Sequence, residues 1–209
     1  MSKVAAISWA LAIGFAVAPA HATKVIGKIQ VTKEFREALA EAEKKRLEAE
    51  PMGYWNEQNG LLPVQPPRVD PARDLGVVLF AKGAPAPGPD DVSTVDVRAA
   101  RLERQVVVVR PGSTLRFNNV DPFDHELYAA KNEAFPPERQ AKGAFRPIEF
   151  AAEGVYEVRC KLMPHFRGHV VVAPATRVIE LDERGRFEIE DLAPGEYTIK
   201  AFHGGAWVL

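Results

Sequence analysis

One short segment of the chain concentrates side chains that bind soft metal ions. It reads RCKLMPHFRGHVVV and carries Cys160, the only cysteine of the 209 residues, followed by Met163, His165 and His169. A thiolate with two imidazoles in a plane and a weak axial thioether is the ligand set of a blue-copper centre, and soft sulfur ligands select copper over harder metals. The segment therefore predicts a copper site. Zinc is the lesser alternative, because cysteine and histidine also bind zinc.

His125 supplies the other half of the predicted site. It lies in FNNVDPFDHELY, about 35 residues before the cysteine, where a strand pattern ends. We predict His125, Cys160 and Met163 as the metal ligands, with His165 as a candidate fourth ligand. The alternatives are structural: a surface histidine at His125, a small buried hydrophobe at Cys160 and a core-packed methionine at Met163. His169 begins a valine-rich run and is expected on the surface.

Composition and motifs exclude several other classes of protein. Lys and Arg number 27 against 28 Asp and Glu, and no basic stripe is present to hold a phosphate backbone, so nucleic acid is not an expected partner. The chain has no HExxH motif, no GxSxG nucleophile elbow and no recognisable pair of carboxylates, and we expect no enzymatic activity. One cysteine cannot close an intramolecular disulfide. In an oxidising compartment, an unpaired cysteine such as Cys160 is expected to be either buried or bound to a metal.

The N-terminal segment has the pattern of a secretory signal peptide. Lys3 precedes the apolar run AAISWALAIGFAVAPA, and Ala20-His21-Ala22 fits the small-x-small rule for cleavage after Ala22. The mature chain would begin at Thr23, carry a net charge of −2, contain no membrane span and be periplasmic or secreted. A redox or envelope protein of that compartment would be its partner. An uncleaved N-terminal anchor is the alternative.

The rest of the chain is expected to be β-structure with one inserted helix. Residues 33–50 are rich in helix formers and carry a thin apolar stripe, which predicts a largely solvated helix. Residues 51–73 hold many prolines and are expected to form a loop. Strands are predicted at 24–31, 75–83, 92–97, 105–109, 114–118, 145–150, 155–160, 170–172, 177–181, 186–189 and 197–201, with 177–181 and 186–189 forming a hairpin. Many short strands predict an all-β, Greek-key β-sandwich.

These motifs together resemble the cupredoxins, above all the short-loop, amicyanin-like type. In that family a first histidine follows a strand that ends in asparagine, as Asn119 precedes His125 here. The second motif of the family runs Cys-x-x-His-x-x-Met-Arg-Gly and continues into a valine-rich strand. Here Cys160, Arg167-Gly168 and the valines stand in the same frame. The resemblance implies a cupredoxin-like sandwich that binds one copper ion for electron transfer or copper handling.

Three residues depart from the pattern of the family. Met163 stands where the family has its second histidine ligand, and Phe166 stands where it has the axial methionine. Glu126 replaces the asparagine that ties the two ligand loops together, and metal sites depend on such supporting contacts. A second register, Cys-x4-His, has azurin-like spacing and brings in His165, but it moves the Arg-Gly pair out of frame. The first register is preferred for the backbone, and ligation by His165 stays open.

Outside this unit the chain resembles carboxypeptidase-regulatory-like, or prealbumin-like, strands. The segments DERGRFEIEDLAPGEYTIKAFH and VIGKIQV carry that resemblance. Together with the signal pattern and the cupredoxin-like motifs, it predicts a signal peptide (1–22), N-terminal strands (23–83) with the inserted helix (33–50) and loop (51–73), a cupredoxin-like domain (84–174) and carboxypeptidase-regulatory-like C-terminal strands (175–209). The alternative to a copper protein is a metal-free β-sandwich that serves as a binding or structural module of a cell-envelope assembly.

Overall fold

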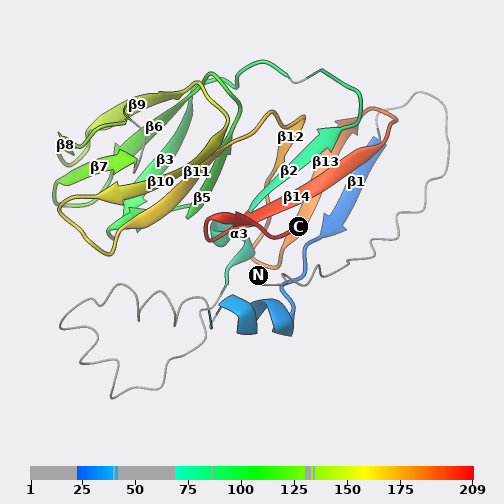
Figure 1. Cartoon of the computed structure of the whole chain (residues 1–209), viewed down its shortest axis with the longest axis horizontal. Helices are drawn as coiled ribbons and strands as arrows, with labels where there is room; N and C mark the ends of the chain where they lie inside the picture. Colours follow the sequence, from blue (N-terminus) through cyan, green and yellow to red (C-terminus); the bar gives the residue numbers. More distant parts are fainter. Residues whose placement is uncertain (1–22, 40, 42–68, 86, 130–132, 134) are drawn as a thin grey trace, which may run out of the picture.

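The structure is a computed structural model that describes residues 23–39, 41, 69–85, 87–129, 133 and 135–209. The predicted signal peptide, most of the second half of the expected helix and most of the proline-rich loop lie outside these residues. Within them the chain folds into two β-sandwiches that lie side by side (Figure 1). The expectation of an all-β sandwich fold is therefore confirmed.

The first sandwich is built from the strands between residues 93 and 172. One sheet has five strands in the order β5-β11-β10-β7-β8, and the facing sheet has four in the order β4-β3-β6-β9. The bounds are β3 (Ser93–Arg98), β4 (Arg101–Leu102), β5 (Val106–Val109), β6 (Ser113–Asn119), β7 (His125–Ala129), β8 (Glu138–Gln140), β9 (Phe145–Phe150), β10 (Gly154–Cys160) and β11 (Arg167–Val172). The pairs β5–β11 and β3–β6 run parallel, so strands distant in sequence become neighbours, as in Greek-key folds.

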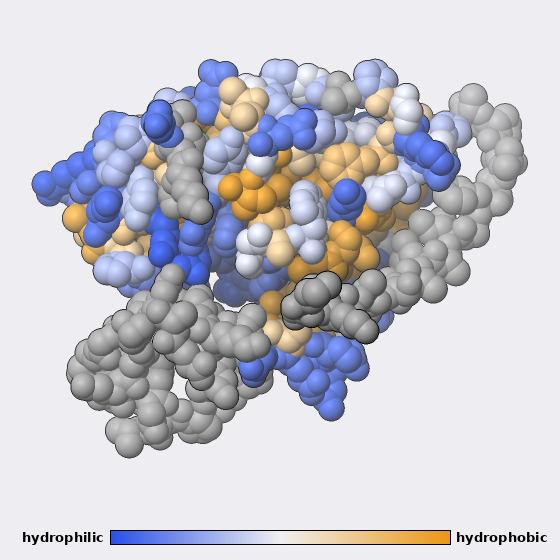
Figure 2. All heavy atoms as spheres, viewed as in Figure 1, coloured by the Kyte–Doolittle hydropathy of each residue, from blue (hydrophilic) through white to orange (hydrophobic). Residues whose placement is uncertain are grey.

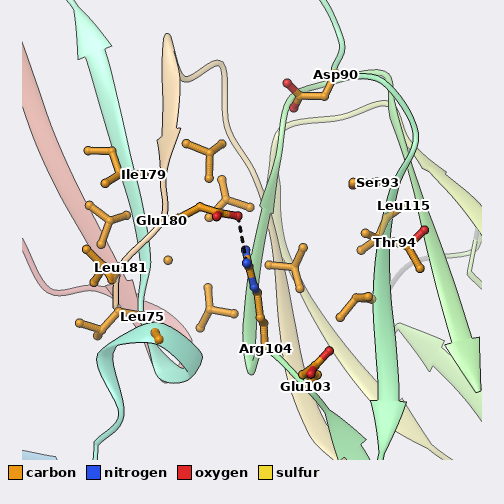
Figure 3. A pocket seen from close by; sticks show the side chains of 18 residues that line it. Leu75, Asp90, Ser93, Thr94, Glu103, Arg104, Leu115, Ile179, Glu180 and Leu181 are labelled. Atoms are coloured by element: carbon orange, nitrogen blue, oxygen red, sulfur yellow. Dashed lines mark hydrogen bonds and ion pairs between the residues drawn. The ribbon is translucent and has the colours of Figure 1, made fainter. Parts of the chain in front are cut away.

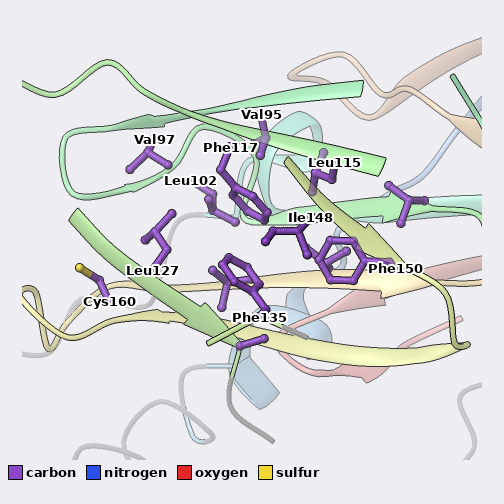
Figure 4. Close-up of a cluster of buried hydrophobic side chains, with 14 of the residues drawn as sticks. Val95, Val97, Leu102, Leu115, Phe117, Leu127, Phe135, Ile148, Phe150 and Cys160 are labelled. Atoms are coloured by element: carbon purple, nitrogen blue, oxygen red, sulfur yellow. The ribbon is translucent and has the colours of Figure 1, made fainter. Parts of the chain in front are cut away.

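Period-two alternation fills the space between these two sheets. Along β9 every second side chain is buried and those between are exposed. The rings of Phe117 and Phe135 meet at a centroid distance of 5.0 Å in the centre of the core. Figure 4 shows these rings between the sheets, with Cys160 at one end of the same cluster beside Leu127. Burial of a large apolar side chain contributes roughly 1.5–3 kcal/mol, and Cys160 belongs to the cluster that these side chains form.

The second sandwich combines segments from both ends of the chain. β1 (Thr23–Lys28) pairs with β13 (Arg186–Leu192), and the facing sheet has the order β12-β2-β14-β15. The bounds of that sheet are β2 (Gly76–Ala81), β12 (Arg177–Ile179), β14 (Tyr197–His203) and β15 (Ala206–Trp207). Its core consists of Leu75, Val77, Leu79, Ile179, Phe187, Ile189 and Ala201.

The hairpin expected between residues 177–181 and 186–189 does not form. The Gly185 N–H donates to the Asp182 carbonyl at 2.8 Å and makes a turn. However, β12 pairs with β2 and β13 pairs with β1, in opposite sheets. The turn therefore carries the chain from one sheet to the other. Each strand has one apolar face, and this crossing buries Ile179 and Phe187 in one shared core.

The proline-rich segment ends in a short helix, so the expectation of a loop through residue 73 is wrong there. α3 (Pro71–Asp74) follows Asp70, whose side chain accepts a hydrogen bond from the Ala72 N–H at 3.1 Å. Proline is compatible with the first position of a helix because its missing N–H has no partner there. The capping carboxylate and the proline thus begin α3, which leads directly into β2.

A third apolar cluster joins the two sandwiches. Its buried members are Val106, Val171, Ala173 and Phe202, with Phe80 and Val108 packed beside them. Arg110 adds polar contacts, since its Nε and Nη2 donate to the carbonyls of Ala175 and Thr176 at 2.9 and 3.0 Å. These carbonyls belong to the connection between the sandwiches. The joint is therefore held by apolar packing and by hydrogen bonds from a largely buried guanidinium.

A cleft of about 410 Å³ lies beside this joint. Figure 3 shows Arg104 of the first sandwich reaching across it to Glu180 of the second, with Nη2 and Oε1 2.9 Å apart. Valine, leucine and isoleucine side chains line its floor. Exposed ion pairs contribute at most about 1 kcal/mol, so the pair spans the cleft without being its main support.

Hydrophobic surface in the view of Figure 2 gathers over the second sandwich and the joint, while the outer end of the first sandwich is mostly polar.

Among the described residues, those at 33–39 form a helix. The Phe35 N–H donates to Oγ1 of Thr32, the residue just before this helix, at 3.2 Å. The Phe35 ring packs edge-on against His203 at 5.6 Å. Within the described part of the chain, no helix has the length and hydrophobicity needed to cross a membrane.

Candidate metal centre

His125 and Cys160 meet at one end of the first sandwich. His125 is the first residue of β7 and Cys160 is the last residue of β10, and these strands pair antiparallel with Cys160 opposite Leu127. The two residues are 0% and 4% exposed. Cys160 Sγ lies 3.7 Å from His125 Nδ1. The strand register thus brings together the histidine and the cysteine that the sequence singled out.

Asp121 determines which ring nitrogen faces the sulfur. Its Oδ2 lies 2.9 Å from His125 Nε2. Burial raises the pKa of Asp121, but hydrogen bonds from the Ala100 N–H, the His125 ring and the Ala99 N–H outweigh it, so the pKa lies below its ordinary value. An ionised carboxylate only accepts hydrogen bonds, so Nε2 carries the hydrogen. In the neutral imidazole, Nδ1 then presents its lone pair to Cys160.

The separation of these two donors fits a shared metal ion. With a metal–sulfur bond of roughly 2.3 Å, a metal–nitrogen bond of roughly 2.0 Å and an angle of about 120° between them, the donors lie about 3.7 Å apart. The observed separation of Nδ1 and Sγ is 3.7 Å. A thiol hydrogen donated to Nδ1 is compatible with the same arrangement. The distance between the two donors is thus compatible with a shared metal ion and with a thiol–imidazole hydrogen bond.

The backbone of Glu126 ties the two ligand loops together. Its N–H donates to Cys160 Sγ at 3.3 Å, and its carbonyl accepts from the Lys161 N–H at 2.9 Å. Neither bond uses the side chain of Glu126. The main chain at Glu126 therefore connects the two segments whichever side chain stands at this position.

Phe166 closes one side of the pair. It is 1% exposed, and its ring centroid lies 5.8 Å from that of His125. Its N–H donates to the Met163 carbonyl at 2.9 Å, which turns the loop tightly after the cysteine. Met163 is half-buried and packs against the core cluster that contains Cys160. A phenyl ring cannot bind a metal, and Phe166 therefore covers the pair without being a candidate ligand.

The remaining histidines of the segment differ in their burial. His165 is exposed. Within the part of the chain that the structure describes, no three His, Cys, Asp or Glu side chains form a group that could hold a metal ion. His169 is half-buried instead of being on the surface, with its ring 5.8 Å from that of Phe202 at the joint. Of the candidate ligands in this segment besides Cys160, Met163 is half-buried against the core cluster and His165 is exposed.

Asp121 is the residue of this site that sequence reasoning missed. Its one signal is a carboxylate four residues before the histidine. That spacing is common in loops and has no diagnostic value alone.

Comparisons with known proteins give structural similarity only. No family model matches the chain, and no curated protein matches it. Amicyanin from Paracoccus versutus is 24% identical, with 46% of this chain and 97% of that chain covered and a TM-score of 0.37. A purple cupredoxin from Nitrosopumilus maritimus is 19% identical, with 39% and 99% covered and a TM-score of 0.36. The chain is thus similar to cupredoxins over part of its length, and its β-sandwich fold is established by its own sheets.

Proposed function

We propose that this protein binds one copper ion through His125, Cys160 and Met163. One observation carries the proposal: the buried donors His125 Nδ1 and Cys160 Sγ lie 3.7 Å apart. Metal binding requires deprotonated ligands. In the neutral imidazole, the Asp121 carboxylate beside Nε2 favours the tautomer with Nδ1 free of hydrogen. The donor chemistry therefore fits a soft metal ion without a change of tautomer.

The ligand set favours the reduced metal. One imidazole, one thiolate and one thioether are soft donors, which select Cu(I). When bound, copper would supply one-electron redox chemistry. Copper handling, in which the protein holds Cu(I) and passes it on, is the function that this set supports best. Electron transfer is the second candidate, favoured by the anchoring of Cys160 in the rigid core.

The proposed compartment is the periplasm or the exterior, on the basis of the N-terminal signal pattern. An unpaired thiol there is protected by burial, and Cys160 is 4% exposed. The partner would be an envelope protein that delivers, accepts or reduces copper. The proposed role is binding and transfer, without catalysis.

Titration of the mature chain, residues 23–209, with Cu(I) and Cu(II) tests this function. We expect one equivalent of Cu(I) to be held against a competing chelator, without a visible band. An intense thiolate-to-Cu(II) band would point to electron transfer instead. Absence of binding in both states would refute the proposal and leave the metal-free envelope module.

Two variants assign the ligands. Cys160→Ser removes the thiolate and is expected to abolish binding. His165→Ala is the matched comparison from the same loop, because His165 is exposed whereas His125 and Cys160 are buried. Loss of affinity in His165→Ala equal to that in Cys160→Ser would show that the loop rearranges to bring His165 in.

A further inference from the structure

The hairpin between β3 and β4 turns through two alanines in a strained conformation. Arg98 and Arg101 pair across the turn, and Ala99 and Ala100 between them have φ values of 53° and 54°. Positive φ at both central residues is the signature of a type I′ turn, which prefers Asn-Gly. A side chain with a Cβ is strained in this conformation. Some other contact must therefore hold the turn.

Asp121 provides that contact. The Ala99 N–H donates to Oδ1 at 2.6 Å, and the Ala100 N–H donates to Oδ2 at 2.8 Å. Asp121 is 5% exposed, and its own N–H donates to Asn119 Oδ1 at 3.0 Å. One buried carboxylate thus satisfies both amides of the turn.

The same carboxylate is the partner of His125. Its Oδ2 lies 2.9 Å from His125 Nε2, on the opposite side of the ring from Cys160. The turn belongs to the sheet β4-β3-β6-β9, and His125 belongs to the facing sheet β5-β11-β10-β7-β8. A continuous series of hydrogen bonds therefore runs from the turn through Asp121 to His125 Nε2, in the ring whose Nδ1 faces Cys160.

We propose that Asp121 is the positioning residue of the metal centre and that it couples the centre to the β3–β4 turn. This inference deepens the proposed copper function and rests on it. The turn amides orient the carboxylate, and the carboxylate orients the ring and selects its tautomer. A change in the β3–β4 turn is therefore transmitted through Asp121 to the His125 ring, and a change at the ring is transmitted to the turn.

A double-mutant cycle on the metal-free chain tests the coupling. Asp121→Asn is made in the natural chain and in an Ala99→Asn/Ala100→Gly chain, whose turn sequence suits type I′. We expect Asp121→Asn to lower Tm more in the natural chain, because only that turn needs the carboxylate. Equal losses in the two backgrounds would overturn the coupling. Asp124→Asn is the control, since it removes the same charge from the same loop but pairs with Arg139.

The nitrogen NMR shifts of the His125 ring test the positioning role in the same metal-free samples. We expect the form with hydrogen on Nε2 in the natural chain and a shift towards the Nδ1–H form in Asp121→Asn. A residue that only stabilised the fold would leave the tautomer unchanged, and that result would overturn the inference.

Copper affinity separates this inference from the function on which it rests. Loss of such a supporting partner lowers metal affinity about 10–100-fold, and we expect a Cu(I) loss in that range for Asp121→Asn. If the natural chain binds no copper while the tautomer and the Tm cycle behave as expected, the proposed function fails and the positioning role of Asp121 stands.

Discussion

Gly76 of β2 lies against Val106 of β5 where the two sandwiches come closest. A Cβ at position 76 would lie 2.5 Å from Cγ1 of Val106 and 2.8 Å from Cγ2 of Val108. Val106 and Val108 belong to the apolar cluster that joins the sandwiches. Glycine is therefore required here by close packing between sheets, since its φ is not in the left-handed region.

Replacement of this glycine should weaken the joint. Gly76→Ala forces a methyl group into the valines, and overpacking of this kind costs about 1–3 kcal/mol. Urea denaturation of the two chains measures the loss. Gly88→Ala is the control, because a Cβ there meets nothing within 4 Å. The packing argument fails if Gly76→Ala is as stable as Gly88→Ala.

Arg110 should be the main polar support of the connection between the sandwiches. It donates to the carbonyls of Ala175 and Thr176 and pairs with Asp90. Arg110→Met keeps the aliphatic stem but leaves these groups unpaired, which costs about 1.5–3 kcal/mol. We expect lower stability and faster proteolysis at residues 173–176. Arg177→Met, at an exposed position, should change neither; the same proteolysis rate in both variants would contradict this role.

Acid should weaken the joint through two histidines. Burial lowers the pKa of His169, while Glu157 raises it and Arg167 and His203 lower it. Burial also lowers the pKa of His203, against the raising effect of Asp74. His169 lies against Phe202, so its protonation would place a charge at the edge of the apolar cluster.

The sign of the pH effect follows from the direction of these shifts. The unfolded chain binds a proton near the ordinary histidine pKa of about 6.5, whereas the folded chain resists protonation until a lower pH. Stability is therefore complete above that pKa and falls as pH drops through it. Denaturation curves between about pH 8 and pH 5 should show this fall, and His169→Gln should reduce it. An unchanged slope in His169→Gln would contradict this role of His169.

The meeting of His125 and Cys160 could be predicted because each residue sits at a strand end in a recognisable frame. The contact of Asp121 with Ala99 and Ala100 could not, because it depends on a hairpin from the facing sheet. Nothing in an Ala-Ala pair indicates a type I′ turn. Supporting contacts of this kind come from tertiary structure, which local patterns do not encode.

Strand positions were predicted better than strand partners for a related reason. The alternation of apolar and polar residues indicates which face of a strand is buried, but it does not indicate which other strand pairs with it. The crossing between β12 and β13 was therefore read as a hairpin. β4, β8 and β15 were missed because two or three residues are too short to show a period. β7, which begins at His125, was also missed. α3 was missed because prolines mark both loops and helix starts.

Two substitutions in the loop that follows Cys160 should create a blue-copper site. In the amicyanin-like motif a histidine and a methionine occupy the positions of Met163 and Phe166. Met163→His/Phe166→Met would then supply the second imidazole and the axial thioether beside His125 and Cys160. The Phe166→Met change roughly conserves volume and should cost less than about 1.5 kcal/mol.

We expect the converted chain to bind one equivalent of Cu(II) with an intense visible band that the natural chain lacks. Leu162→His/Phe166→Met is the control, because it adds a histidine to the same loop at a position that is 46% exposed. A band in the converted chain alone would show that the loop keeps an amicyanin-like backbone frame around the His125–Cys160 pair. Bands of equal intensity in both variants would mean that the loop is too mobile to define its ligands. A colourless converted chain would mean that residue 163 does not face the pair, and the thioether of Met163 would then lose its place in the proposed ligand set.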